Sequence, residues 1–543
     1  MTSCSGKLGE LSSDNFTVTP NPLETQAGKI PATVNGTFPE KYMKKKAVVT
    51  VTPELRYADG QVAKGEPSVF QGEKAYGNGQ TILYQTGGRY NLKTTFDYLD
   101  CNKADMYLTF DAKIGSKTVE VPAVKVAEGI LATSELCKNT MKSAQAAIAT
   151  DAFQRITAQK QEASIKFLIQ QANLRQSELK NNSVQEFVRL LEQINNDREG
   201  LSMKEIEVSA YASPDGGYDL NDKLAAQRQK ATEKYVQQQL KNTNLTGTSV
   251  DAKYTAEDWE GFQELVKASN IQDKDVILRV LSMYKDPQER EQQIKNISSA
   301  FRELADGILP QLRRSRMIIN YEVIGRSDEQ IMAQLKEDPS KLSVEELLYA
   351  ATLTDDTNAK EEIYKTTTKV YPSDARAYNN IASMEYAKGN LDAAKNYIAQ
   401  AQKINGKLPE AAANLGLIAL ANGDIQTAEN YIGQATGANG LAEALGNLNL
   451  AKGNYAQAEQ DFKDIYSNSA ALAQIMNKDY ASAAVTLKYI TNPDATTEYL
   501  KSVLAARMGN TAEAAEALRS AISKDASYAK YAGYDLELQN VAK

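Results

Sequence analysis

The feature that most restricts the fold is a turn that recurs through residues 340–543. Four of these turns are Gly-Asn or Gly-Asp and a Lys-Asp pair occupies one further place, giving the series Gly389-Asn390, Gly423-Asp424, Gly453-Asn454, Lys478-Asp479 and Gly509-Asn510. Five residues after each turn begins lies an alanine, and nine residues after it lies a large apolar side chain: Ala394 and Ile398, Ala428 and Ile432, Ala458 and Phe462, Ala483 and Leu487, Ala514 and Leu518. Small residues let two helices cross closely, and large ones fill the space against the next pair. The pattern therefore predicts stacked helix pairs that are stable only together.

The first complete unit of this series resembles a tetratricopeptide repeat. The positions that carry the resemblance are Ala382, Tyr386 and Gly389 in its first helix and Ala394, Tyr397 and Ala401 in its second. Five repeats are visible, the later ones shortened, and we interpret Leu347 to Tyr364 as a degenerate sixth. The resemblance implies a curved array whose concave face binds a peptide or a partner domain. We expect its many tyrosines to serve packing more often than contact.

The middle of the chain, residues 160–326, alternates strand and helix patterns. Strands are expected over 165–169, 206–211 and 313–323, and helices over 178–194 and 221–228. The second strand runs into Ser213-Pro214-Asp215-Gly216, and the next helix carries Asn221, Leu224 and Arg228. Order and spacing resemble the OmpA-like peptidoglycan-binding domain, in which a glycine-containing loop precedes an Asn-x-x-Leu-x-x-x-Arg helix. Residues 244–309 depart from that family as a polar, helical expansion, and we expect Trp259 in its core.

The resemblance implies a ligand, the diaminopimelate of the peptidoglycan stem peptide. This amino acid is a zwitterion, so its carboxylate suits a guanidinium and its ammonium suits a carboxylate. Arg228 falls on the arginine position of the family, whereas Ser213 stands where the family has an aspartate. Asp215 could replace that charge, and Gly216 and Asn221 complete the candidate site. The structural alternative is that Gly216 supplies a positive φ, Asn221 caps the helix and Arg228 pairs with a nearby carboxylate.

A period of two in the apolar residues runs from about residue 20 to 135. It is clearest over 47–52, 81–84, 90–98 and 106–112, and glycine-containing turns separate these segments. Short alternating strands at this spacing predict a two-sheet sandwich of the immunoglobulin kind, serving as a spacer or docking module. From Ser143 to Gln161 the apolar residues Ala144, Ala147, Ile148 and Phe153 share one helical face, so a helix is expected to begin the next domain.

Three cysteines allow two predictions. Cys4 follows two small residues and precedes Ser5-Gly6, which resembles the end of a bacterial lipoprotein signal, where the cysteine is lipidated; the alternative is an exposed thiol in a disordered start. Residues 1–19 would then be a flexible tether to the outer membrane. Cys101 and Cys137 could form one disulfide in an exported protein or remain two buried thiols.

Composition excludes several classes of function. The chain of 543 residues has no histidine, so the usual general base and the common zinc ligand sets are missing. Its net charge of −7 disfavours nucleic acid as a partner. No apolar run reaches the ~18 residues that a membrane-spanning helix needs. We expect neither an enzyme, a metal nor a cofactor.

These observations predict a multidomain protein with a β-sandwich (20–140), a central α+β OmpA-like domain with a helical expansion (141–326) and an all-α repeat array (327–543). The expected function is that of an outer-membrane lipoprotein on the periplasmic side, a scaffold that tethers the membrane or an envelope complex to peptidoglycan and recruits a protein through its repeats. The alternative is a structural subunit of an outer-membrane assembly, export or motility complex that does not bind peptidoglycan.

Overall fold

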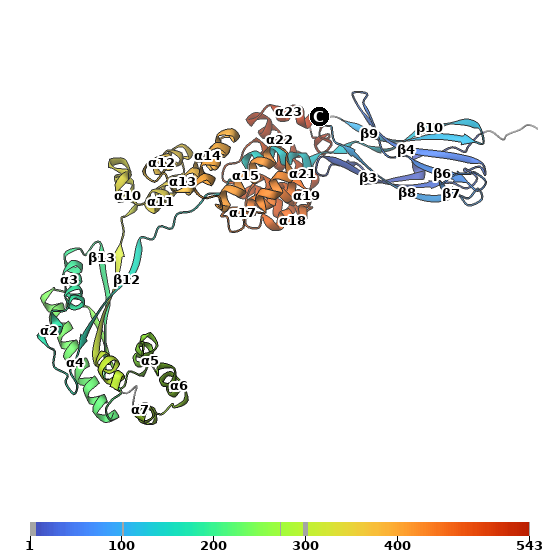
Figure 1. Cartoon of the computed structure of the whole chain (residues 1–543). Helices are drawn as coiled ribbons and strands as arrows, with labels where there is room; N and C mark the ends of the chain where they lie inside the picture. Colours follow the sequence, from blue (N-terminus) through green and yellow to red (C-terminus); the bar gives the residue numbers. More distant parts are fainter. Residues whose placement is uncertain (1–6, 100–102, 272, 297–301, 542–543) are drawn as a thin grey trace, which may run out of the picture. The chain divides into compact units, whose positions relative to one another are not determined.

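The chain folds into two compact units, and the second is inserted into the first. The structure, a computed structural model, describes residues 7–99, 103–271, 273–296 and 302–541. Unit 1 contains Met1–Asp151 and Asp338–Lys543, and unit 2 contains Ala152–Glu337. The multidomain fold class is confirmed, with a β-rich amino-terminal region and an all-helical carboxy-terminal array (Figure 1).

The amino-terminal region of unit 1 is built from two sheets with a shared apolar core, and their strands pair antiparallel except for β6 and β7, which are parallel. The first has the order β1-β3-β8, with β1 (Phe16–Thr19), β3 (Lys29–Phe38) and β8 (Gly88–Asp97). The second has the order β10-β9-β4-β6-β7, with β10 (Lys117–Glu128), β9 (Ala104–Ile114), β4 (Ala47–Tyr57), β6 (Ser68–Gly72) and β7 (Gln80–Ile82), and β5 (Val62–Lys64) pairs with β4. In β3 and β8 every second side chain is buried, as the period of two requires. A short parallel pair, β2 (Leu23–Glu24) and β11 (Ile130–Leu131), follows the sandwich.

The carboxy-terminal region of unit 1 is a stack of helix pairs. Its helices are α11 (Val344–Ala350), α12 (Thr357–Val370), α13 (Ala375–Ala387), α14 (Leu391–Ile404), α15 (Pro409–Ala421), α16 (Ile425–Ile432), α17 (Leu441–Ala451), α18 (Tyr455–Asp461), α19 (Asn468–Met476), α20 (Tyr480–Tyr489), α21 (Ala495–Arg507), α22 (Thr511–Lys524) and α23 (Ser527–Tyr534). The four turn glycines have φ between 75° and 80°, and Lys478 adopts the same left-handed conformation with φ 65°. All five predicted alanines and all five large apolar residues are buried.

Close helix crossing depends on glycine at two points of the array. A Cβ at Gly446 would lie 2.6 Å from ring atoms of Phe462, and one at Gly416 would lie 2.4 Å from a side-chain carbon of Ile432. Because Phe462 and Ile432 are the large residues of the pattern, each fills the space that a small residue opens on the neighbouring helix. The array therefore packs as the sequence pattern predicts.

The segment between the sandwich and unit 2 differs from the expectation. It begins with short helices, η2 (Thr133–Leu136), α1 (Cys137–Thr140) and η3 (Met141–Ser143), and residues 144–155 then form neither helix nor strand. The helix expected over 143–161 is wrong, since β12 already begins at Ile156. The physical reason is that Ala147 and Ala149 bury their side chains two residues apart, against the array, as described below.

Unit 2 is a four-stranded sheet covered by helices. The strand order is β12 (Ile156–Lys166), β15 (Arg314–Ile324), β13 (Leu201–Tyr211) and β14 (Ser249–Thr255). The helices α2 (Gln176–Leu179), α3 (Asn182–Asn196) and α4 (Tyr218–Asn242) lie among these strands in the chain, and α3 and α4 pack on the sheet (Figure 1). The predicted order of strands and helices is present, but β14 is an additional strand that pairs in parallel with β13.

The expansion of unit 2 has a core of its own. It comprises α5 (Trp259–Ala268), α6 (Lys274–Met283), α7 (Pro287–Asn296), the π-helical turn η4 (Leu304–Ile308) and α9 (Leu309–Leu312), and α10 (Asp328–Glu337) ends the unit. Trp259 packs at the edge of this core, with its ring 5.6 Å from that of Phe262, and its Nε1 donates to Glu257. The segment expected to be wholly helical thus also contains β14. Across the described ranges we find no helix with both the length and the apolar character to span a bilayer.

Candidate functional site

All five residues of the predicted ligand site meet around one hollow of unit 2. Ser213, Asp215, Gly216, Asn221 and Arg228 line a space of about 50 Å³. A pocket that encloses a small organic ligand usually measures ~300 Å³ or more. The hollow is therefore far too small, as it stands, for an amino-acid zwitterion.

The guanidinium of Arg228 is fully engaged by the protein. It is 1% exposed. Its Nε donates to the carbonyl of Gln171 (3.0 Å), Nη1 to that of Tyr211 (2.9 Å) and Nη2 to that of Leu168 (3.3 Å). The cation also lies 5.1 Å from the ring centre of Phe167. Burial, with the nearby positive charge of Arg313, lowers the pKa of Arg228 to about 10.

The carboxylate proposed for the other half of the clamp is also paired. Asp215 Oδ2 accepts a hydrogen bond from Arg313 Nη2 (2.6 Å), and Asp215 Oδ1 accepts one from Ser213 Oγ (2.5 Å). Arg313 Nε donates to the same serine hydroxyl (3.1 Å). Asn221 does not cap its helix but donates to the carbonyl of Gly216 (2.9 Å). Gly216 is not among the described glycines with positive φ.

Arg313 is the residue of this cluster that the sequence did not place in the site. The visible signal was the pair Arg313-Arg314 at the start of the closing strand. Arg314 turns to Asp258 (3.3 Å), so the two neighbouring arginines serve different carboxylates. The cluster holds the loop to the strand. The assignment of these residues to peptidoglycan binding stays a prediction.

The predicted modification sites fall mostly outside the described residues. Cys4 and Cys101 lie there, so their lipidation and pairing stay predictions. Burial raises the pKa of the Cys137 thiol to about 12, which makes it a poor nucleophile. Within the described part of the chain, no three His, Cys, Asp or Glu side chains come together as a metal site.

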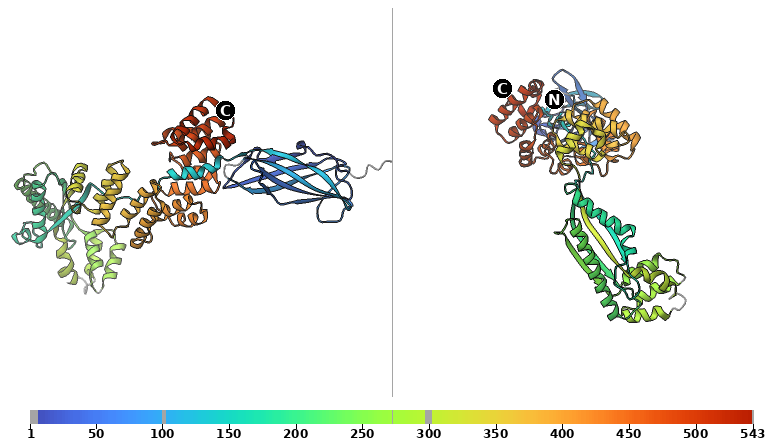
Figure 2. Two further views of the ribbon diagram at one scale, coloured as in Figure 1. Left: turned by 90° about the horizontal axis from the view of Figure 1, so that it is seen from above. Right: turned by 90° about the vertical axis from the view of Figure 1, so that its left-hand side faces the viewer.

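The second candidate site lies on the array, and the chain itself occupies it. Residues 133–150 pack against the first helices of successive pairs, α13, α15, α17 and α19, and we call this surface of the array the groove (Figures 1 and 2). On α13, Asn380 accepts the N–H of Ala149 (2.8 Å) and donates to its carbonyl (2.9 Å). On α15, Asn414 does the same for Ala147, at 2.6 and 2.9 Å. Each asparagine thus holds both polar groups of one backbone residue.

A third helix continues this ladder. On α17, Glu443 Oε1 accepts the N–H of Gln145 (3.4 Å). Successive helix pairs therefore bind the backbone N–H groups of residues 149, 147 and 145. This spacing of two fits an extended chain, in which alternate N–H groups point to the same side. Glu443 is 3% exposed, and burial raises its pKa to about 7. The groove has a protonatable group in contact with the segment.

Further contacts also address the main chain of the segment. The carbonyl of Ala147 accepts Asn379 Nδ2 (3.0 Å) and Ser383 Oγ (2.7 Å), and Tyr386 donates to the carbonyl of Met141 (2.9 Å). Over residues 144–150 the side chains that the segment buries are small, namely Ala144, Ala147 and Ala149. The face that the repeat pattern predicted to bind a peptide thus holds one, and that peptide is internal.

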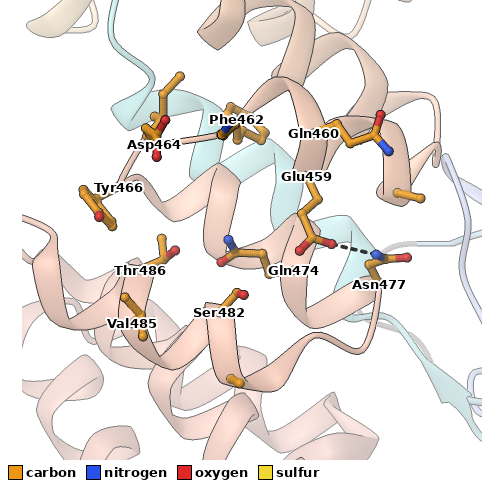
Figure 3. Close-up of a pocket in the computed structure, with 14 residues that line it drawn as sticks. Glu459, Gln460, Phe462, Asp464, Tyr466, Gln474, Asn477, Ser482, Val485 and Thr486 are labelled. Carbon is orange, nitrogen blue, oxygen red and sulfur yellow. Dashed lines mark hydrogen bonds between the residues drawn. The ribbon is translucent and has the colours of Figure 1, made fainter.

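A hollow of about 760 Å³ remains on the array between α18, α19 and α20 (Figure 3). It forms where α18 has 7 residues, half the length of α14 with 14. Glu459 and Asn477 are joined across it by a hydrogen bond of 2.6 Å. Tyr466 and Val485 are exposed at its border. This surface is mixed in character and is not covered by the internal segment.

Comparison with known proteins identifies the array. Two sequence models of the tetratricopeptide repeat match residues 375–408 and 413–474. Residues 375–408 and 413–474 of the array are tetratricopeptide repeats. Tetratricopeptide repeats are modules of protein–protein interaction with extended binding surfaces. No curated protein matches the sequence.

Several solved structures are similar to the tetratricopeptide-repeat region. A tetratricopeptide repeat protein from Parabacteroides merdae is 16% identical with a TM-score of 0.27, over 43% of this chain and 93% of that one. Pseudomonas aeruginosa pilF is 14% identical with a TM-score of 0.27, over 39% and 95%. YrrB, described as having an unusual peptide-binding site, is 16% identical with a TM-score of 0.22, over 39% and 100%.

Proposed function

We propose that the protein is a non-catalytic structural subunit of a bacterial envelope assembly that does not depend on peptidoglycan binding. The observation that carries this proposal is the internal occupation of the repeat groove. Asn380 and Asn414, which would hold a foreign peptide, hold Ala149 and Ala147 instead. The internal segment then joins the sandwich to the array and leaves the outer surfaces of the array for partners. The hollow beside Tyr466 and Val485 is one such surface.

The outer-membrane location is a further part of the proposal. It rests on the sequence around Cys4, which resembles a lipoprotein signal end. Mass spectrometry of the protein extracted from native membranes tests it, since an unmodified Cys4 would contradict the anchor.

Cross-linking in native membranes followed by affinity purification of the full chain tests the structural role. We expect one or more partner proteins in fixed ratio to the chain. Recovery of the chain alone, from cells in which it is abundant, would show that it is not an assembly subunit.

A peptidoglycan tether is the second candidate, and one observation favours it. Ser213, Asp215, Gly216, Asn221 and Arg228 do come together at one hollow. Ligand entry would require the ion pair between Asp215 and Arg313 to open, at a cost of ~1.5–3 kcal/mol for a hydrogen bond between charged groups.

Sedimentation with purified sacculi separates the two candidates. The structural role predicts that the wild-type chain stays in solution. The tether predicts that it pellets, and that Arg228→Lys lowers retention at least tenfold. Arg189→Lys on α3, at a side chain that is 66% exposed, is the matched control and leaves retention unchanged.

A further inference from the structure

Unit 1 is assembled from two separate stretches of chain. We call Met1–Asp151 the amino half and Asp338–Lys543 the carboxy half. Unit 2 lies between them in the sequence, so the only covalent path from one half to the other runs through unit 2. The two halves are held together by non-covalent contacts alone.

These contacts extend along the array. Near α13 and α15 they are the asparagine ladder described above. Near α19, Thr140 and Ser469 form a buried hydrogen bond between hydroxyl oxygens 3.0 Å apart. At the carboxy-terminal end, Thr133 donates to Glu537 (2.9 Å). Near the sandwich, Gln26 donates to the carbonyl of Gly453 (3.2 Å).

The apolar cores also combine residues of both halves. One core contains Met141, Ala144, Ala147 and Ala149 of the amino half together with apolar residues of α13 to α17. A second contains Leu136 of the amino half together with residues of α17 to α23. Each of these two cores is completed only when both halves are in contact.

The connection between the halves has the properties of a hinge. Residues 150–155 lie between the segment bound to the array and β12 and contain no helix or strand, and beyond them β12 and β15 run antiparallel from Ile156 paired with Ile324. The amino half is thus connected to unit 2 through these few extended residues. A change in their backbone conformation would redirect the amino half while unit 2 stays folded.

We propose that the amino half of one copy of this chain docks on the carboxy half of a second copy, giving a segment-exchanged dimer. The occupant of the groove is known, because it is the segment already seated there. The hydrogen bonds and apolar contacts between the two halves are the same whether the halves belong to one chain or to two. Protein concentration and the conformation of the hinge therefore determine whether the monomer or the exchanged dimer forms. The proposal goes beyond the structural role given above, which requires only the filled groove.

Disulfide trapping between two single-cysteine variants tests this exchange. The full-length chain carries Cys4→Ser, Cys101→Ser and Cys137→Ala in all samples. One variant adds Thr140→Cys and the other adds Ser469→Cys, two small buried residues whose side-chain oxygens are in contact. The two variants are unfolded, mixed, refolded at several concentrations and oxidised. A chain carrying both substitutions is the control and forms the bond within itself at low concentration.

The expected result is a covalent heterodimer on a non-reducing gel. Its ratio to monomer rises about tenfold for a tenfold rise in refolding concentration, as mass action requires at low occupancy. No heterodimer at any concentration, with the intrachain bond formed in the control, would overturn the proposal. If the control does not oxidise, light scattering of refolded wild-type protein measures its mass instead. A dimer that forms with rising concentration and persists on dilution supports the exchange. Monomer alone refutes it.

Discussion

Asn414→Ala tests whether the internal segment is held by its backbone. Asn414 is buried, accepts the N–H of Ala147 at 2.6 Å and donates to its carbonyl at 2.9 Å. The carbonyl keeps two other donors after the substitution, from Asn379 and Ser383, but the N–H loses the acceptor shown for it. A buried donor left without a partner costs ~1–3 kcal/mol, and the better helix propensity of alanine returns ~0.5 kcal/mol. We therefore expect the segment to be destabilised by about 1.5 kcal/mol.

Native-state hydrogen exchange measures this directly. A loss of about 1.5 kcal/mol raises the exchange rate of the Ala147 and Ala149 amides about tenfold, while the amides of unit 2 stay unchanged. Asn439→Ala is the matched control, because its side chain is exposed and makes one bond of 3.1 Å to the carbonyl of Ile148. Equal protection of Ala147 in wild type and Asn414→Ala would refute the reasoning.

Three other predictions follow from packing and charge. Gly446→Ala should lower the free energy of unfolding of unit 1 by ~1–3 kcal/mol, because its Cβ would overlap an aromatic ring. Gly533→Ala, which has open space around its Cβ, should be neutral or stabilising. Urea unfolding of the two variants compares these free energies. Glu443 has its pKa raised by burial from 4.5 to about 7, so it is protonated more readily in the folded state. Its stabilising effect is complete below pH ~4.5 and is lost as the pH rises through about 7, and Glu443→Gln should flatten this part of the pH–stability curve. Arg228→Met removes a buried guanidinium that donates to three backbone carbonyls and should destabilise unit 2 by ~3 kcal/mol or more, unlike exposed Arg189→Met, as thermal unfolding will show.

The array could be predicted closely because its determinants are local and repeated. The turn glycine permits the left-handed conformation of the turn, and the alanine five residues after the turn begins lets the two helices of a pair cross closely. Even Lys478, the turn without glycine, has the left-handed φ that its place in the series implies. The period of two likewise placed β4, β8 and β9, since one face of each is buried.

The contents of the groove could not be predicted in the same way. Ala144, Ala147 and Ile148 also fit a helical stripe, and alanine favours helix when nothing else decides. The extended conformation is stabilised instead by Asn380 and Asn414, which lie more than 200 residues away in the sequence. Their side chains form hydrogen bonds with the backbone of the segment. The contacts of Arg228 could not be predicted either, because a side chain that donates to backbone carbonyls leaves no residue pattern in the sequence.

The insertion of unit 2 also sets the order of events during synthesis. Synthesis of the groove-filling segment is finished once residue 151 has been added, whereas the last helix of the array ends at Tyr534. At ~5–20 residues per second, the nascent segment waits about 20–80 s for its groove, with its alanines and Leu136 exposed to other chains and to chaperones. The sandwich and unit 2 can fold during this interval, but unit 1 is completed only after α23 has been made.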